Sequence, residues 1–137
     1  MITVEDIVMI TILLGTCIII ALICIIYPSK KIKEGISMNY PIGKKVIIRT
    51  NRAGAFFGTL SEYDAVTRIA EIKDCRRLWY WSGAASLSQL ANEGVKNPSD
   101  CKFTVVVPVI QVMEVIEIIP CTEKAIKNIE SVWVWKK

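Results

Sequence analysis

Residues 45–81 read KVIIRTNRAGAFFGTLSEYDAVTRIAEIKDCRRLWYW, and their pattern predicts a series of short β-strands. Runs rich in β-branched and aromatic residues predict strands, and turn residues separate these runs. The four predicted strands occupy residues 45–50, 55–61, 66–74 and 76–81. Because the connections are short, each strand is expected to pair antiparallel with the next, which gives a β-meander.

The chain after the meander adds two short helices and further strands. A helix is predicted at residues 86–93, because Ser86 can cap its first turn and Gly94 can adopt a left-handed conformation at its end. A last short helix begins after Thr122. The two further predicted strands occupy residues 102–107 and 109–119. Since an open sheet would leave its edges uncovered, we expect a mainly β (α+β) fold, a small, partly open, SH3-like antiparallel barrel with two short helices.

An apolar run precedes this domain. Residues 7–27 read IVMITILLGTCIIIALICIIY, with no charged residue and no proline. A helix of ~21 residues, rising about 1.5 Å per residue, covers the ~30 Å hydrocarbon layer, so the run predicts one transmembrane helix. Lysines follow the run closely, whereas Glu5 and Asp6 precede it, which places the N-terminus outside and the domain in the cytosol. We therefore expect a single-pass protein of the bacterial inner membrane.

This interpretation divides the chain into four parts. They are a short outer tail at residues 1–6, the transmembrane helix at 7–27, a basic linker at 28–39 and a cytosolic β-rich domain at 40–137. Small side chains on one face of the span could let two helices approach closely in lipid. The alternative is a plain anchor that faces lipid. The predicted face consists of Ile10, Leu14, Cys17, Ala21 and Cys24. The residues assigned to the span as a whole are Ile7, Leu14, Cys17, Ala21, Cys24 and Tyr27.

The charge is distributed unevenly along the chain. All 17 Lys and Arg follow the apolar run, against 11 of the 13 Asp and Glu. A basic domain beside a membrane suits anionic lipid headgroups, and it also suits nucleic acid. The excess of charge is moderate, so an ordinary solvated surface is an equally open interpretation.

The residue types argue against an enzyme. The chain has no His, which excludes Ser-His and Cys-His arrangements for nucleophilic catalysis. Its five cysteines have no regular spacing, which favours neither a disulfide framework nor a zinc site. We therefore expect reduced thiols, no metal, no cofactor and no small-molecule substrate.

Basic and aromatic side chains form the best candidate binding surface. Trp, Tyr and Arg concentrate binding energy at protein interfaces, and aromatic faces beside Arg also suit single-stranded nucleic acid. A structural role in the core is a third interpretation, since side chains along a strand alternate between its two faces. The candidate residues are Arg76, Arg77, Trp79, Tyr80, Trp81, Trp133 and Trp135.

Residues 76–103 read RRLWYWSGAASLSQLANEGVKNPSDCKF. With IRTNRAGAFFGTL before and EVIEIIPCTEKA after, this run resembles a family of small uncharacterised proteins encoded by bacteriophages and prophages, with a motif of the form RLWYWxGAASLxQLAxxGVKxPxxCKF. The resemblance implies a phage or prophage origin and a compact β-rich domain, and it implies no particular chemistry. The added membrane span departs from the family pattern.

A looser likeness concerns residues 43–74. Their pattern of strands, glycine-containing turn and Asp turn is similar to that of the Sm-like RNA-binding fold, with Gly43, Gly54, Gly58, Leu60 and Asp64 at the matching places. This likeness would imply assembly into a ring and binding of single-stranded RNA.

Together these patterns predict a non-catalytic, membrane-anchored binding or assembly module of phage or prophage origin. It would act at the cytosolic face of the bacterial inner membrane or in the lipid layer of a virion. Its expected partners are membrane lipid and either another protein or a second copy of the chain. The alternative is a membrane-tethered, Sm-like protein that binds single-stranded nucleic acid.

Overall fold

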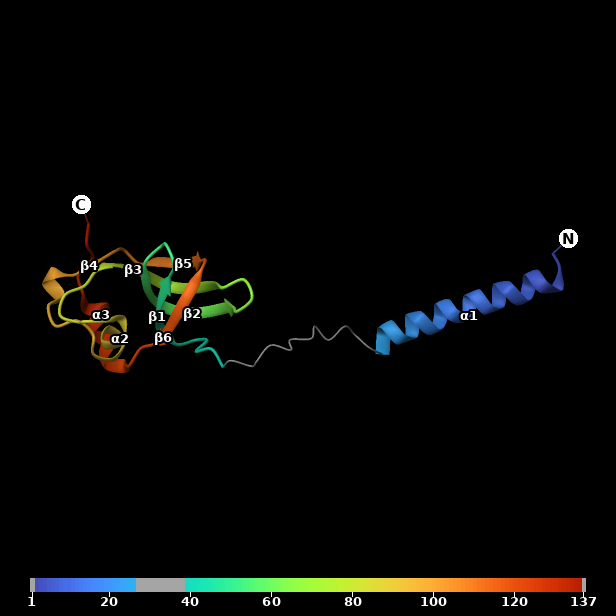
Figure 1. The fold of residues 1–137 in the computed structure, drawn as a ribbon, viewed down its shortest axis with the longest axis horizontal. Coiled ribbons are helices and arrows are strands. Elements are labelled where there is room, and N and C mark those ends of the chain that lie inside the picture. Colours follow the sequence, from blue (N-terminus) through green and yellow to red (C-terminus); the bar gives the residue numbers. More distant parts are fainter. Residues whose placement is uncertain (1, 27–38, 137) are drawn as a thin grey trace. The chain divides into compact units, whose positions relative to one another are not determined.

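The computed structural model describes residues 2–26 and 39–136, and side chains are described at 2–18 and 39–136. The chain divides into two compact units, Met1–Met38 and Asn39–Lys137. The first unit contains one helix, α1 (Val4–Ile26) (Figure 1). Asp6 accepts hydrogen bonds from the backbone N–H and the hydroxyl of Thr3 at 3.0 and 2.7 Å, which fixes the start of this helix.

The predicted membrane span requires correction. Among the residues that the structure describes, no helix is both long enough and apolar enough to cross a bilayer. The single-pass topology and the inner-membrane location depended on this span and are therefore not supported. The expected lipid partner depended on the same span. Tyr27 and the predicted linker up to residue 38 lie outside the described residues.

The second unit is built on one antiparallel sheet of six strands. The strands are β1 (Lys45–Thr50), β2 (Ala55–Asp64), β3 (Ile69–Tyr80), β4 (Lys102–Phe103), β5 (Val107–Val112) and β6 (Val115–Pro120). Their order is β4-β3-β2-β1-β6, and β5 also pairs with β3. The expected β-rich, antiparallel character of this domain is therefore confirmed.

The last two strands connect opposite edges of the meander. β5 pairs with the first half of β3, from Ala70 opposite Val112 onward, whereas β6 pairs with β1. Only two residues separate β5 from β6, and Glu114 among them has a φ of 56°. The chain therefore turns sharply there and curls the sheet around an interior.

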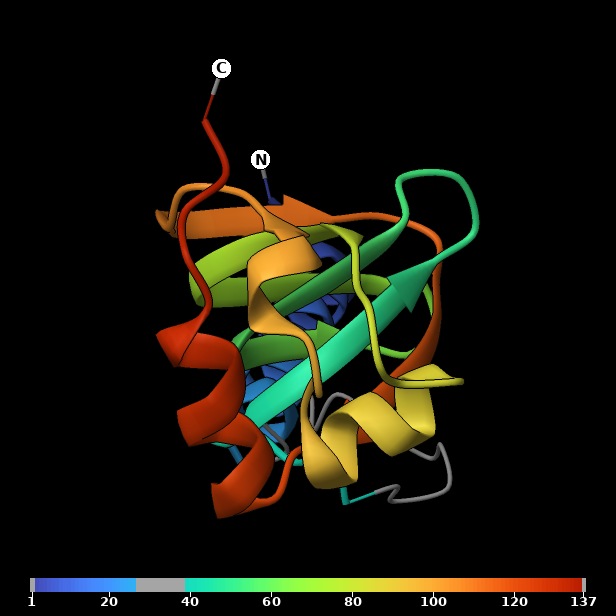
Figure 2. The ribbon, with the colours of Figure 1, turned by 90° about the vertical axis from the view of Figure 1, so that its left-hand side faces the viewer.

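Two helices cover the outer face of this sheet. They are α2 (Leu87–Glu93) and α3 (Glu123–Ser131), and a short 3-10 turn (Pro98–Asp100) leads into β4. Figure 2 shows the two helices side by side against the strands. The predicted caps are confirmed, because the hydroxyls of Ser86 and Thr122 accept hydrogen bonds from the amides of Gln89 and Ala125 at 3.2 Å.

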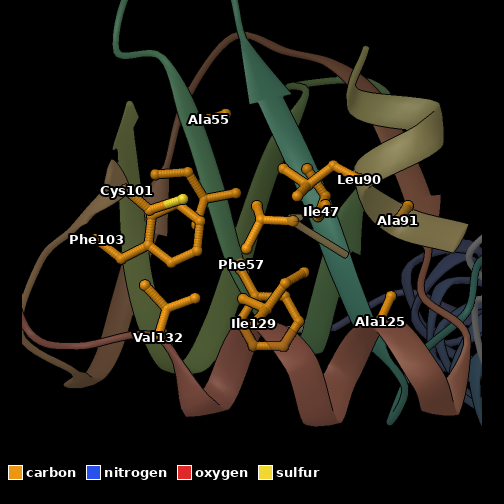
Figure 3. Close-up of a cluster of buried hydrophobic side chains, with 12 residues drawn as sticks. Ile47, Ala55, Phe57, Leu90, Ala91, Cys101, Phe103, Ala125, Ile129 and Val132 are labelled. Atoms are coloured by element: carbon orange, nitrogen blue, oxygen red, sulfur yellow. The ribbon is translucent and has the colours of Figure 1, made fainter. Parts of the chain in front are cut away.

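Both faces of the sheet are buried. On β1, Ile47 packs in a cluster between the sheet and the two helices, whereas Val46 and Ile48 pack in the curled interior. Figure 3 shows the first cluster, in which Phe57 and Ile129 lie together between strand and helix. A strand with both faces buried reads as a continuous apolar run, which explains the sequence of β1.

Two predicted strands proved to be one. Residues 66–74 and 76–81 were expected to form separate strands, but β3 continues through both. Asp74 has a φ of 47°, and the register against β2 shifts between Phe57 and Thr59. β3 therefore contains a β-bulge at this point and continues beyond it. The predicted strand at 109–119 instead divides between β5 and β6 at Met113 and Glu114.

Candidate binding surface

Arg76 is a structural residue. It is only 4 % exposed, and its guanidinium donates four hydrogen bonds to backbone carbonyls. The acceptors are the oxygens of Thr104, Ile129, Val132 and Trp133, at 3.0 to 3.1 Å. Burial lowers the pKa of Arg76 from its ordinary value. Since these donors are engaged, Arg76 holds the end of α3 against the sheet and offers nothing to a ligand.

Arg77, the next residue, lies on the opposite face of β3. Its guanidinium stacks over the ring of Phe56 with 4.7 Å between the guanidinium carbon and the ring centroid, and Nη1 donates to the carbonyl of Ala53 at 3.2 Å. A guanidinium has five N–H groups, so most of those of Arg77 remain available. Among the described residues, no carboxylate lies within ion-pair distance of it.

Two shallow cavities adjoin Arg77. They have volumes of about 250 and 280 Å³, and they share Arg52, Ala53 and Arg77 in their walls. Trp79, which is 64 % exposed, lines one cavity, and Met113, which is 67 % exposed, lines the other. We call this region the arginine hollow; its defining residues are Arg52, Phe56, Arg77, Trp79 and Met113.

The other arginines near the arginine hollow have acidic neighbours. Arg52 lies 3.9 Å from the carboxylate of Glu114, and Arg49 lies 3.8 Å from that of Glu117. These exposed pairs contribute little to stability. In the wall of the hollow, the carboxylate of Glu114 offsets the guanidinium of Arg52, whereas the described residues include no such carboxylate partner for Arg77.

The C-terminal segment joins the sheet at its outer edge. Phe103 forms a parallel bridge with Val134, and the N–H of Trp135 donates to the carbonyl of Phe103 at 2.8 Å. Tyr80 lies opposite Lys102 in the β3–β4 pair, and the Lys102 ammonium is 5.7 Å from the ring centroid of Trp135. We call this surface the aromatic edge; its residues are Tyr80, Lys102, Trp133, Val134 and Trp135.

The structure divides the predicted aromatic and basic cluster among three places. Arg76 and the half-buried Trp81 belong to the packing around the first core cluster. Arg77 and Trp79 lie in the arginine hollow. The remaining predicted residues, Tyr80, Trp133 and Trp135, belong to the aromatic edge, where Trp133 is 80 % exposed. The predicted span residues Ile7, Leu14 and Cys17 lie on α1 in the first unit, whereas the side chains of Ala21, Cys24 and Tyr27 are outside the described residues.

Sequence reasoning missed Arg52, Lys102 and Met113. Arg52 stands in a turn, and Met113 stands at the bend between β5 and β6. Nothing local distinguishes such residues from ordinary surface positions, because it is the curling of the sheet that brings the turn and the bend to the same end. The bend depends on the positive φ of Glu114, which the sequence does not show.

The thiols are not arranged for chemistry. Burial raises the pKa of Cys75 to about 12 and that of Cys121 to about 11. Both groups are therefore neutral thiols at neutral pH, and the thiolate is the reactive form. In the described parts of the chain, no group of three Cys, Asp or Glu side chains is placed to hold a metal ion.

We expect these two thiols to resist modification in the folded protein. At pH 8, an aqueous disulfide reagent should label Cys75 and Cys121 at least about a hundredfold more slowly in the native chain than in urea, as followed by mass spectrometry of labelled peptides. Because folding raises both pKa values, the folded state holds these protons more tightly. The resulting stability is fully present below about pH 9 and is lost as the pH rises toward 11 and 12. Equal labelling rates in both states would contradict this assignment.

Most of the second unit matches a known protein family. Residues 43–129 match the family described as a domain of unknown function, DUF6948. No curated protein and no solved structure matches the chain significantly. The matched range contains all six strands, α2 and most of α3, as well as Arg77 and Trp79. It covers more than half of the 137 residues, and the chain therefore belongs to the DUF6948 family.

Proposed function

We propose that residues 39–137 form a non-catalytic binding module that recognises another protein through the aromatic edge. The observation that carries this proposal is the exposure of large aromatic side chains on an ordered strand edge. Trp133 is 80 % exposed and Tyr80 is 51 % exposed. Burying such rings removes a large apolar area from water, and Trp and Tyr dominate binding energy at protein interfaces.

Exposed valines extend this surface. Val105, Val106 and Val107 come after Phe103 and Thr104 in the chain and are 40 to 51 % exposed. Several exposed apolar side chains in one place are typical of an interaction site. Pro108, which directly follows these valines in β5, has no N–H, so it opposes the addition of a further strand there. We therefore expect the partner to contact side chains and not to extend the sheet.

Single-stranded nucleic acid has weaker support as the ligand. The hypothesis relied on Arg76 and Arg77 beside aromatic rings, and the guanidinium of Arg76 is engaged by four carbonyls. Of these two arginines, Arg77 is the one with N–H groups left to contact a phosphate. A phage or prophage origin also stays part of the proposal, and its support is the motif that begins with Arg77, Leu78 and Trp79.

Site-specific photo-cross-linking tests the protein-binding proposal. A photoreactive phenylalanine analogue replaces Trp133 in the full chain, in the cells that naturally produce it. The control carries the same analogue at Val66, which is 92 % exposed in the turn between β2 and β3. We expect a discrete product with a protein or a second copy of the chain from position 133 only. A nuclease-sensitive product, the same product from both positions, or none would contradict the proposal.

A further inference from the structure

We propose that the arginine hollow binds one carboxylate of the partner protein together with a large apolar side chain next to it. This inference rests on the proposed protein-binding function, and it names the chemistry that the partner must present. The carboxylate would pair with the guanidinium of Arg77, and the apolar side chain would lie against Trp79 or Met113. An acidic residue beside a leucine or an aromatic residue has this chemistry.

Arg77 is already held in place for such a contact. The ring of Phe56 supports its guanidinium at 4.7 Å, and the carbonyl of Ala53 accepts from Nη1 at 3.2 Å. A side chain that is fixed before binding loses less conformational freedom when the ligand arrives. The planar guanidinium also matches the two oxygens of a carboxylate better than an ammonium would.

The wall on the Met113 side of Arg77 is mostly apolar and favours an apolar neighbour. The two cavities have volumes of about 250 and 280 Å³, and since a water molecule in the liquid occupies about 30 Å³, each holds several waters. Trp79 lines one cavity, and Met113 and Ile110 line the other. An apolar side chain that displaces those waters gains hydrophobic stabilisation, whereas a lone anion would not. The hollow therefore fits a charged group with an apolar companion.

The charges around the hollow distinguish one carboxylate from a chain of phosphates. Glu114 lies beside Arg52, and Glu117 lies beside Arg49. A nucleic acid carries one negative charge per nucleotide and gains affinity by meeting many cations. Here Glu114 stands in the wall of the Met113 cavity, so successive phosphates across the hollow would approach this carboxylate. A single carboxylate can instead pair with Arg77 from the Trp79 cavity, whose wall contains no acidic residue.

Solution NMR of the full chain tests the inference. The probe is the peptide acetyl-Leu-Glu-Phe-amide, and the matched probe is acetyl-Leu-Gln-Phe-amide, which has the same shape without the charge. The signals followed are the Nε–H of Arg77 and the indole N–H of Trp79. We expect saturable shifts of both signals with the Glu peptide and about tenfold weaker binding of the Gln peptide. The variant Arg77→Gln should abolish the difference between the peptides, whereas Arg49→Gln should preserve it.

Other outcomes overturn the inference. Equal binding of the two peptides would show that the charge is not recognised, and no shift at Arg77 with either peptide would show that the hollow does not take this group. The oligonucleotide octathymidylate is a third probe; stronger and steeply salt-dependent shifts with it would assign the hollow to nucleic acid. If position 133 cross-links to a protein while the peptides fail, this inference alone is wrong. If position 133 also gives no protein product, the proposed function fails with it.

Discussion

Replacing Arg76 with leucine is expected to lower the free energy of unfolding by about 3–5 kcal/mol. The guanidinium is 4 % exposed and is the donor for four carbonyls, two of them in bonds that are fully buried. Leucine fills part of the volume but leaves those carbonyls without a donor, and each unsatisfied buried group costs about 1–3 kcal/mol. Urea denaturation of the full chain, followed by tryptophan fluorescence, measures the loss.

The control for Arg76→Leu is Arg49→Leu. Arg49 lies on the surface of β1, where its ion pair with Glu117 is exposed, so its replacement should change the unfolding free energy by less than about 1 kcal/mol. Arg76→Lys should lie between the two, because one ammonium keeps the charge but cannot reach all four acceptors. Similar losses for Arg76→Leu and Arg49→Leu would mean that the buried hydrogen bonds do not stabilise the fold.

Replacing Gly94 with alanine is expected to cost about 3–4 kcal/mol. Gly94 ends α2 with a φ of 79° and a ψ of −159°, a backbone conformation almost confined to glycine, and strain there costs on the order of 1–3 kcal/mol. An added Cβ would also lie 2.5 Å from the side-chain Cγ of Asn128 and closer still to its Oδ1. The amide of Asn128 accepts from the N–H of Val95 at 2.7 Å and donates to its carbonyl at 3.1 Å. The variant must therefore disturb the contact between α2 and α3, which thermal unfolding of the full chain would report.

Gly43→Ala is the control for Gly94→Ala, because it introduces backbone strain without a steric clash. Gly43 has the same φ of 79°, but no atom lies within 4 Å of an added Cβ. We expect a loss of about 1–2 kcal/mol from the backbone alone. If Gly94→Ala costs no more than Gly43→Ala, then Asn128 moves aside freely, and its two hydrogen bonds do not hold the helices together.

Local signals in the sequence predicted the local structure well. Ser86, Gly94 and Thr122 mark helix ends because caps depend on one or two residues and their immediate neighbours. The single strand β3 was missed because it continues through Asp74, whose positive φ coincides with a shift of the register against β2 that the sequence does not show. The apolar run 7–27 predicted a membrane helix from composition, and no helix of the described residues meets the requirement for a span.

The sequence could not predict which arginine of the candidate site is structural and which is accessible to a ligand. Arg76 and Arg77 are adjacent and chemically identical, yet the first is buried beneath α3 and the second lines a hollow. Strand alternation predicts that they lie on opposite faces, but it cannot say which face a helix covers. Here both faces are buried over part of the sheet, so the usual contrast between an apolar and a polar face is absent. Only the placement of α3, far along the chain, decides their roles.

The position of Arg76 also bears on how the chain is made. Its carbonyl partners in and after α3 lie 53 to 57 residues later in the sequence, and β1 pairs with β6. A ribosome releases the chain from its N-terminus, so the meander emerges well before the residues that complete its edges. During that interval, the apolar faces of β1, β2 and β3 stand exposed, which is the situation in which nascent chains aggregate or engage chaperones. The second unit therefore folds to completion only after the segment around Val132 has left the ribosome.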